Sequence, residues 1–310
     1  MRLVIATRRS PLALRQSELA AAALKALEPA LEIAFLPLVT SGDRILDRAL
    51  AELGGKGLFL KELEEALRDR RADLAVHSLK DVPAELAPGL CLGAVLPRED
   101  PRDALVSERF ASLAALPAGA RVGTSSPRRA ALLRALRPEL DVVPLRGNVG
   151  TRLGKLARGE YDALIMAAAG LLRLGEGARI REWLDPERFV PAVGQGVIAI
   201  ECREEDGELR GLLAALDHAP TRIAARAERA FAAALGGHCQ LPVAAYARWQ
   251  GEDLVLRAMV VAADGRPLAA EARGAPAEPE ALGRALAERL RAAERAGEGA
   301  LALAPLVAPR

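Results

Sequence analysis

Apolar and polar positions along the first 85 residues alternate between the spacing of a strand and that of a helix. Short apolar runs bounded by turn residues indicate buried strands, and apolar residues three or four apart indicate amphipathic helices. Ser10 is a natural N-cap, and Pro11 suits the first helical position. The expected elements are a strand at 3–6, a helix at 10–29, a strand at 32–40, a loop at 41–56, a helix at 57–72 and a strand at 73–83. This β-α-β-α-β order predicts a parallel sheet with covering helices.

The same pattern returns in the middle of the chain. The stretch LPREDPRD at 96–103 is rich in proline and charge, which predicts a junction between domains. Beyond it, a strand with a threonine at its end leads into Ser126-Pro127 and an arginine-rich amphipathic helix. Residues 140–175 continue as strand, glycine turn, helix, strand and helix. The chain therefore contains two α/β units that each start with a strand, a Ser-Pro pair and a helix.

The last third of the chain has a different pattern. Gly236-Gly237 is a helix C-cap signature, and Asp264-Gly265 is a hairpin signal. The expected elements are a helix at 220–235, strands at 241–250, 253–265 and 266–274, and a helix at 278–294. They predict a small α+β domain.

Composition and charge limit the class of protein. The chain of 310 residues is 51% hydrophobic and carries 43 basic and 41 acidic residues, as a globular protein of two or three domains does. No stretch approaches the ~20 apolar residues of a membrane span, and the first residues lack the order of a signal peptide, so we expect a cytoplasmic protein. A net charge of +2 lacks the electrostatic footprint of a nucleic-acid binder.

Three cysteines, Cys91, Cys202 and Cys239, lie far apart in the sequence. This odd, sparse set argues against a disulfide framework, and the absence of C-x-x-C and H-x-x-x-H spacings argues against a metal site. Cys239 differs from the others because it follows two glycines in the stretch LGGHCQLP, at the entrance of the last domain. A loop thiolate there can act as a nucleophile and form a stable thioether. A small core cysteine is the alternative.

Arginines accompany both predicted Ser-Pro helix starts. Arg8 and Arg9 precede the first start, and Arg128 and Arg129 follow the second. A helix N-terminus presents unpaired N–H groups and a partial positive charge, so it binds anions. Two such edges on two similar lobes suggest a cleft for an anionic ligand. The alternative is that the Ser-Pro pairs only cap helices and that the arginines are solvated.

The stretch HSLKDVP at 77–83 is a candidate for chemistry. Asp81 follows Lys80 at the carboxyl end of a predicted strand, where open α/β sheets bind their ligands. A carboxylate beside a cation stays ionised, and it can stabilise a cationic intermediate or accept a hydrogen bond. A surface Lys-Asp pair before a proline turn is the alternative. The stretches GGKG and GNVGTRLG match neither the nucleotide P-loop nor the dinucleotide motif.

Eight motifs occur in a fixed order: ATRRSPLAL, GGKGLFLKELEEAL, HSLKDVP, VGTSSPRR, LRGNVGTRL, AAGLLRLG, VGQGVIAIE and GGHCQLPV. Together they resemble the porphobilinogen deaminase (hydroxymethylbilane synthase) family over essentially the whole chain. The resemblance implies two α/β domains like those of periplasmic binding proteins with a central cleft, and a small C-terminal α+β domain with a three-stranded antiparallel sheet and helices. The implied domains are residues 1–97 with 196–215, residues 98–195, and residues 216–310.

The resemblance also implies an activity. Members of this family are transferases that join four porphobilinogen units head to tail, lose ammonia at each step and release the linear tetrapyrrole hydroxymethylbilane for haem biosynthesis. They use a covalent dipyrromethane cofactor, which a loop cysteine carries through a thioether. That cysteine matches Cys239, although His238 stands where the family more often has glycine. The family further implies a monomer that takes porphobilinogen as its small-molecule substrate, without nucleic-acid or membrane partners.

Site residues are implied by matching the family's motifs to this chain. Asp81 matches the catalytic carboxylate, which stabilises positive charge on pyrrole nitrogens and assists proton transfer. Guanidinium groups suit the acetate and propionate of each pyrrole ring, and the matching arginines are Arg8, Arg128, Arg129, Arg146, Arg152 and Arg173. Hydrogen bonds to cofactor or substrate are implied for Ser10, Gln16, Lys80, Thr124, Ser126 and Gln195, and a lid for Lys56 and Phe59. No metal is implied.

A two-lobed small-anion binding protein is the main alternative function. It explains two α/β lobes and arginine-loaded helix N-termini. It explains neither the loop cysteine nor the third domain, and a secreted binder would need a signal peptide.

Overall fold

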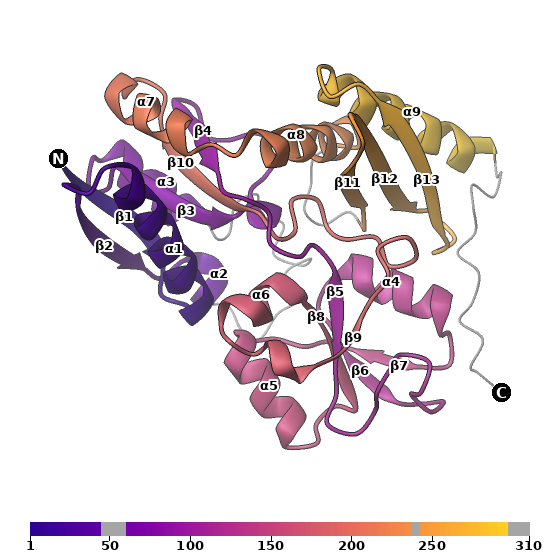
Figure 1. Cartoon of the computed structure of the whole chain (residues 1–310). Helices are drawn as coiled ribbons and strands as arrows, with labels where there is room; N and C mark the ends of the chain where they lie inside the picture. Colours follow the sequence, from indigo (N-terminus) through magenta and orange to yellow (C-terminus); the bar gives the residue numbers. More distant parts are fainter. Residues whose placement is uncertain (45–59, 237–241, 297–310) are drawn as a thin grey trace. The chain divides into compact units, whose positions relative to one another are not determined.

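The computed structural model describes residues 1–44, 60–236 and 242–296 (Figure 1). Contacts divide the chain into two compact units. Unit 1 comprises Met1–Glu99 and Gly196–Arg222, and unit 2 comprises Asp100–Gln195 and Ile223–Arg310. The chain therefore passes from unit 1 to unit 2 inside the LPREDPRD stretch, and it returns inside the VGQG stretch.

Unit 1 is a five-stranded sheet with helices on both faces. The strand order is β2-β1-β3-β10-β4, in which β1 is parallel to β2 and β3, whereas β10 is antiparallel to β3 and β4. Helix α1 packs with α7 over one face around Ile5, and α3 covers the other face around Ala6. The elements are β1 (Arg2–Arg8), α1 (Pro11–Leu27), β2 (Glu32–Leu38), α2 (Ser41–Arg44), α3 (Lys61–Arg68), β3 (Leu74–Ser78), β4 (Leu90–Val95), β10 (Ile198–Arg203) and α7 (Gly207–Leu216).

Unit 2 contains a second sheet of the same kind, in the order β7-β6-β8-β5-β9. Strand β6 is parallel to β7 and β8, and β5 is antiparallel to β8 and β9. Leu105 and Ile165 face the core under α4, whereas Leu164 and Met166 face α5 and α6. The elements are β5 (Asp103–Val106), β6 (Arg121–Gly123), α4 (Pro127–Leu136), β7 (Asp141–Val143), α5 (Val149–Ala157), β8 (Ala163–Ala167), α6 (Ala168–Arg173) and β9 (Ile180–Trp183).

The third sheet also belongs to unit 2 and is buried on both faces. Its strands are β11 (Ala244–Gln250), β12 (Asp253–Val261) and β13 (Pro267–Gly274), and its helices are α8 (Ala219–Ala234) and α9 (Pro279–Ala296). One cross-strand row, Ala244, Met259 and Ala269, packs into the core under α4. The neighbouring row of alanines packs against α8 and α9. Small side chains on both faces let this sheet pack between two layers, so residues 100–195 and 223–310 form one unit.

Most elements expected from periodicity are confirmed, including Ser10 and Ser126 as N-caps and the hairpin at Asp264-Gly265. Gly236, just after α8, has φ +103°, as expected for a residue that ends a helix. The expected parallel sheet is corrected to a mixed one in both units, because β10 in unit 1 and β5 in unit 2 run antiparallel to their neighbours. Strand β10 enters unit 1 from the return crossing and therefore runs antiparallel to β3. Of the loop expected at 41–56, only the short helix α2 lies within the described residues, and the three-domain division stays a prediction.

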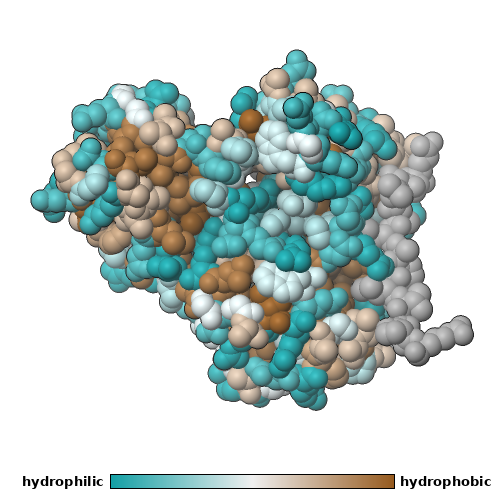
Figure 2. Space-filling view, viewed as in Figure 1, coloured by the Kyte–Doolittle hydropathy of each residue, from teal (hydrophilic) through white to brown (hydrophobic). Residues whose placement is uncertain are grey.

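The surface of unit 1 carries an apolar area. Figure 2 shows hydrophobic side chains gathered over the region of α1 and β2, and in these elements Leu27 and Phe35 are 45% and 41% exposed. Among the residues that the structure describes, no helix is long and apolar enough to cross a membrane.

Candidate active site

The predicted site residues of unit 1 lie at one edge of its sheet. Because β1 and β3 are parallel, their carboxyl ends meet at the same edge. Arg8 is the last residue of β1 and is partly buried, whereas Arg9 is exposed. Ser10 then caps α1, since its Oγ accepts a hydrogen bond from the backbone N–H of Ala13 at 3.3 Å. The edge thus combines a helix N-terminus with a nearby guanidinium group.

Gln16 holds the end of β3 at this edge. Its side chain is buried, and its Nε2 donates to the Oγ of Ser78 at 2.8 Å. Ser78 is the last residue of β3, and the 3-10 turn Leu79–Asp81 follows it. Lys80 and Asp81 in that turn are partly buried. Gln16 therefore fixes the point from which the turn with the candidate carboxylate departs.

His77, the first residue of the HSLKDVP motif, points into the interior. Its Nε2 lies 2.8 Å from Oε2 of Glu201 on β10, and both side chains are buried. The other carboxylate oxygen of Glu201 has no hydrogen-bond partner among the described residues. Burial and the negative charge of Glu201 raise the pKa of Glu64 on α3. The motif thus combines a buried residue of the sheet with two partly exposed residues beyond it.

In unit 2 the second Ser-Pro pair begins α4, at the carboxyl edge of the parallel strands β6, β7 and β8. Pro127 is the first helical residue, and the Oγ of Ser126 accepts from the backbone N–H of Arg129 at 3.4 Å. Thr124 is buried, and its Oγ1 accepts from the N–H of Ser126 at 3.2 Å. These bonds define the loop between β6 and α4.

A buried carboxylate, Asp103, binds both arginines of this helix start. Arg128 Nη1 donates to Asp103 Oδ2 at 2.7 Å, and Arg129 Nε and Nη2 donate to Oδ1 at 2.9 and 2.7 Å. The carbonyls of Val190 and Ile165 accept further bonds from Arg128 and Arg129. The two arginines are only 4% and 7% exposed. The alternative that this pair is solvated is therefore wrong.

The charges of this cluster do not balance. Burial alone would raise the pKa of Asp103, but the positive charges of Arg128 and Arg129 outweigh it and lower the pKa to about 2. One ionised carboxylate faces two guanidinium groups, so Asp103, Arg128 and Arg129 together carry one excess positive charge. The Nε of Arg128 is buried without a hydrogen-bond partner among the described residues. Such a cluster favours the approach of an anion.

Gln195 completes the cluster from the return crossing. Its Nε2 donates to Asp103 Oδ1 at 3.0 Å and to the carbonyl of Pro101 at 2.7 Å, and its side chain is fully buried. Local sequence patterns do not identify Asp103, because the prolines and charges of LPREDPRD indicate only a junction between domains. The signal was a carboxylate directly before the apolar residues Ala104–Val106 of a fully buried strand.

The remaining predicted arginines of unit 2 belong to the segments that follow the carboxyl ends of β7 and β8. Arg146 and Arg152 flank the start of α5 and are partly buried. The Nε of Arg152 donates to the carbonyl of Gly147 at 2.7 Å, which orients its side chain along the loop. Arg173, in the last turn of α6, is also partly buried. The structure thus gathers predicted residues at one edge in each unit.

Cys239, Lys56 and Phe59 lie outside the described residues, but both elements that flank the cysteine are described. Glu228 on α8 is buried, and its carboxylate accepts from the N–H groups of Gly194 and Ala247 at 2.7 and 2.8 Å. It therefore ties α8 and β11 to the return crossing. Helix α4, with its arginines, packs against β13 of the same unit.

Comparisons with known proteins give the family. The model "porphobilinogen deaminase, dipyromethane cofactor binding domain" matches residues 3–211, and "porphobilinogen deaminase, C-terminal domain" matches residues 222–292. A protein of Xanthomonas axonopodis pv. citri (strain 306) named porphobilinogen deaminase is 57% identical over 287 residues, which cover 92% of this chain and 94% of the relative. One of Ralstonia nicotianae with the same name is 57% identical and covers 93% and 88%. The chain belongs to the porphobilinogen deaminase family.

A solved structure of the VFT2 domain of Bordetella pertussis BvgS is 18% identical, covers 69% of this chain and 85% of that one, and has a TM-score of 0.42.

Within the porphobilinogen deaminase family match, the predicted carboxylate and arginines fall in the cofactor-binding model, and Cys239 falls in the C-terminal model. The described residues contain no group of three or more His, Cys, Asp or Glu side chains that could hold a metal ion.

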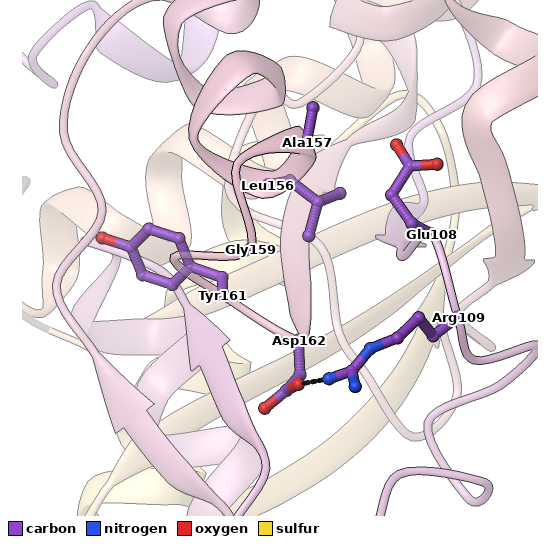
Figure 3. Close-up of a pocket in the computed structure, with 7 residues that line it drawn as sticks. All are labelled: Glu108, Arg109, Leu156, Ala157, Gly159, Tyr161 and Asp162. Atoms are coloured by element: carbon purple, nitrogen blue, oxygen red, sulfur yellow. Dashed lines mark hydrogen bonds and ion pairs between the residues drawn. The ribbon is translucent and has the colours of Figure 1, made fainter.

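A separate hollow of about 340 Å³ lies on unit 2 (Figure 3). Glu108 and Arg109 line one side, and Tyr161 and Asp162 line the other, with an ion pair between Arg109 and Asp162. Asp162 also accepts from the N–H of Arg121, which begins β6. Thr124 and Ser126 follow the other end of that strand, so the hollow is not part of the candidate site.

Proposed function

We propose that this protein joins four porphobilinogen units head to tail, with loss of ammonia at each step, and releases the linear tetrapyrrole hydroxymethylbilane. The observation that carries the proposal is the cluster of Asp103, Arg128 and Arg129, which has one excess positive charge, in a chain that belongs to the porphobilinogen deaminase family. Every porphobilinogen unit brings an acetate and a propionate, so binding the growing chain requires positive charge inside the protein.

The chemistry of the described donors fits a dipyrromethane cofactor, which has four carboxylates. When bound, this group supplies the pyrrole carbon to which the next unit is joined. Arg128 and Arg129 are preorganised by Asp103, so they hold a carboxylate without the entropic cost of ordering long side chains. Ser126, Thr124 and the N-terminus of α4 add hydroxyl and N–H groups at the same edge. The other acetate and propionate groups of the cofactor and the substrate units are proposed to bind Arg8, Arg146, Arg152 and Arg173.

Asp81 is assigned the catalytic role. Loss of ammonia leaves positive charge on a pyrrole nitrogen, and a carboxylate near that nitrogen lowers the energy of the charged state. Asp81 is partly buried and follows the end of β3, which Gln16 fixes through Ser78. Lys80 precedes it in the same 3-10 turn. In this role Asp81 also assists the transfer of a proton to the amine that leaves as ammonia and the removal of a proton from the ring at which the new bond forms.

Cys239 is assigned as the attachment point, through a thioether. Its loop joins α8 to β11, and both elements are tied together by Glu228 within unit 2. We further propose that the enzyme is a cytoplasmic monomer with three domains, 1–97 with 196–215, 98–195 and 216–310. Lys56 and Phe59 are assigned to a lid over the substrate.

The decisive measurement is the intact mass of the purified protein and of a Cys239→Ala variant. The parent is expected to be heavier than its sequence by two deaminated porphobilinogen units, and the variant is expected to have the bare mass. Cys91→Ala is the matched control and should keep the added mass. If the parent has the bare mass even after incubation with porphobilinogen, the covalent mechanism is wrong, and a two-lobed anion-binding protein becomes the better interpretation.

The role of Asp81 is tested by turnover. Asp81→Ala should fold normally and carry the cofactor mass but lose turnover of porphobilinogen by two or more orders of magnitude, about the loss expected when a single electrostatic group at a reacting centre is removed. Glu85→Ala, at another acidic position after β3, is the control and should keep its activity. Near-normal turnover of Asp81→Ala would remove this residue from the mechanism.

A further inference from the structure

Two cysteines of unit 1 face each other across neighbouring strands. In the antiparallel pairing of β4 and β10, Cys202 lies directly opposite Cys91, and their Sγ atoms are 3.8 Å apart. Directly opposite residues of antiparallel strands have Cα atoms about 4.5–5.5 Å apart, which is within the range that a disulfide spans. Rotation of the two side chains is therefore enough to bring the sulfurs into bonding distance.

The two thiols differ in their access to solvent. Cys91 is partly exposed on the edge strand β4, whereas Cys202 is fully buried against the core under α1 and α7. Gly93 leaves room for this packing, because a Cβ at that position would lie only 3.1 Å from the Sγ of Cys202 and would meet the side chain of Leu213. A reagent from solvent therefore reaches Cys91 first.

The pKa of Cys202 also indicates that Cys91 is the more reactive of the two thiols. Burial and the neighbouring Cys91 raise the pKa of Cys202 to about 12, so Cys202 stays a thiol near neutral pH. A thiolate is the form that attacks a peroxide. Cys91 is thus the group that is oxidised first, and Cys202 is the only described thiol within reach of the product.

We propose that Cys91 and Cys202 form an oxidative modification site, which a hydroperoxide converts into a cross-strand disulfide. The Cys91 thiolate attacks hydrogen peroxide, giving a sulfenic acid and hydroxide. The Cys202 sulfur then attacks the sulfenic sulfur, its proton leaves with the departing hydroxyl group as water, and the S–S bond forms. Two thiols and one hydrogen peroxide give one disulfide and two waters. This proposal does not depend on the proposed function.

The place of the pair in the sheet predicts what the disulfide does. Cys202 is opposite Leu74 at the start of β3, whereas Ile198 is opposite Ser78 at its end, just before Lys80 and Asp81. The disulfide therefore forms at the end of the sheet remote from the candidate carboxylate. It should raise the temperature of unfolding of unit 1 by several degrees and leave turnover of porphobilinogen unchanged.

The test is peroxide titration of the full-length holoenzyme, followed by alkylation under denaturing conditions and tryptic mapping. Trypsin places the cysteines on separate peptides, 81–98, 189–203 and 230–248. The expected product is a protein lighter by two hydrogen atoms, in which peptides 81–98 and 189–203 are joined and neither takes up alkylating reagent. Reduction with dithiothreitol should restore both alkylation sites.

Cys91→Ser is the control for the order of events, and after peroxide its Cys202 should remain a thiol that is alkylated on denaturation. Three results would overturn the proposal. Cys91 could gain two or three oxygen atoms while Cys202 stays reduced, both thiols could survive an excess of peroxide, or Cys91 could be joined to another peptide. Because these readouts are masses, they stand whether or not the enzyme turns over porphobilinogen.

Discussion

Helices α1 and α4 begin in the same way, but the arginines near their N-termini differ in position and burial. Both follow a parallel strand, have a serine N-cap and start with proline. In unit 1, Arg8 and Arg9 precede the cap, where they are partly buried or exposed. In unit 2, Arg128 and Arg129 follow the proline and are buried on Asp103. The same local backbone design thus carries a solvent-facing charge in one unit and an internal charge cluster in the other.

The difference lies in the antiparallel strand that pairs with a parallel strand of each sheet, which is β10 beside β3 in unit 1 and β5 beside β8 in unit 2. In unit 2 the antiparallel strand β5 begins with Asp103 and brings a carboxylate beneath the start of α4. Two buried guanidinium groups without it would face the full cost of desolvation and mutual repulsion. A helix N-terminus with buried arginines therefore requires a carboxylate from elsewhere in the chain, which a local motif does not reveal.

Among the changes that test this difference between the two helix starts, removal of Asp103 should have the largest effect on stability. Asp103→Ala leaves Arg128 and Arg129 buried without their counter-charge, and we expect unit 2 to lose about 3–5 kcal/mol of unfolding free energy. Both tryptophans of the chain, Trp183 and Trp249, belong to unit 2, so their fluorescence in urea reports on this unit.

Asp264→Ala is the matched control for that experiment. Asp264 pairs with Arg266 in the same unit, but both side chains are at least half exposed. Its loss should change the urea midpoint little, because water replaces both the exposed ion pair and the exposed hydrogen bond that Asp264 accepts from the backbone N–H of Arg266. Equal losses for Asp103→Ala and Asp264→Ala would mean that the buried cluster contributes nothing beyond an ordinary surface pair.

Acid should reveal the same cluster with a smaller effect. Because the pKa of Asp103 is lowered from 3.8 to about 2, its ionised form stabilises the native state above about pH 4, and this contribution is lost as the pH falls toward 2. The shift corresponds to about 2 kcal/mol. Tryptophan fluorescence in urea at each pH should follow it, and Asp103→Asn should remove that part of the pH dependence. The same slope in the variant would assign the acid sensitivity to other carboxylates.

Local signals in the sequence predicted most of the fold. Ser10, Ser126, Gly236 and the Asp264-Gly265 turn act through their own backbone geometry, so a short stretch is enough to identify them. The strands β4, β5, β9 and β10 were not predicted. Strand β10 shows why, because its partner β3 is more than 100 residues away and only the return crossing brings them together.

In the candidate site, too, residues within local motifs were predicted, whereas residues that act on distant parts of the chain were not. Asp81 and the arginines were predicted by motifs that match the porphobilinogen deaminase family, and their assigned roles stay predictions. Asp103 and Glu228 were not predicted, because each acts on groups far away in sequence. The double burial of the third sheet was also missed, since alanine-rich strands look the same whether one face or both faces are covered.

The smallest expected effect comes from removing the N-caps, which tests whether Ser10 and Ser126 stabilise their helices equally. Ser10→Ala and Ser126→Ala each remove one hydrogen bond to a backbone N–H, and each should cost about 1 kcal/mol, whereas glycine at either position should cost only a few tenths. Because unit 1 contains neither tryptophan nor tyrosine, hydrogen exchange of peptides from α1 and α4 is the suitable measurement. Equal costs would mean that capping is common to both units and that charge alone separates them. A much larger cost at Ser126 would mean that the buried arginines depend on the cap as well as on Asp103, so that backbone geometry and charge in unit 2 stabilise each other.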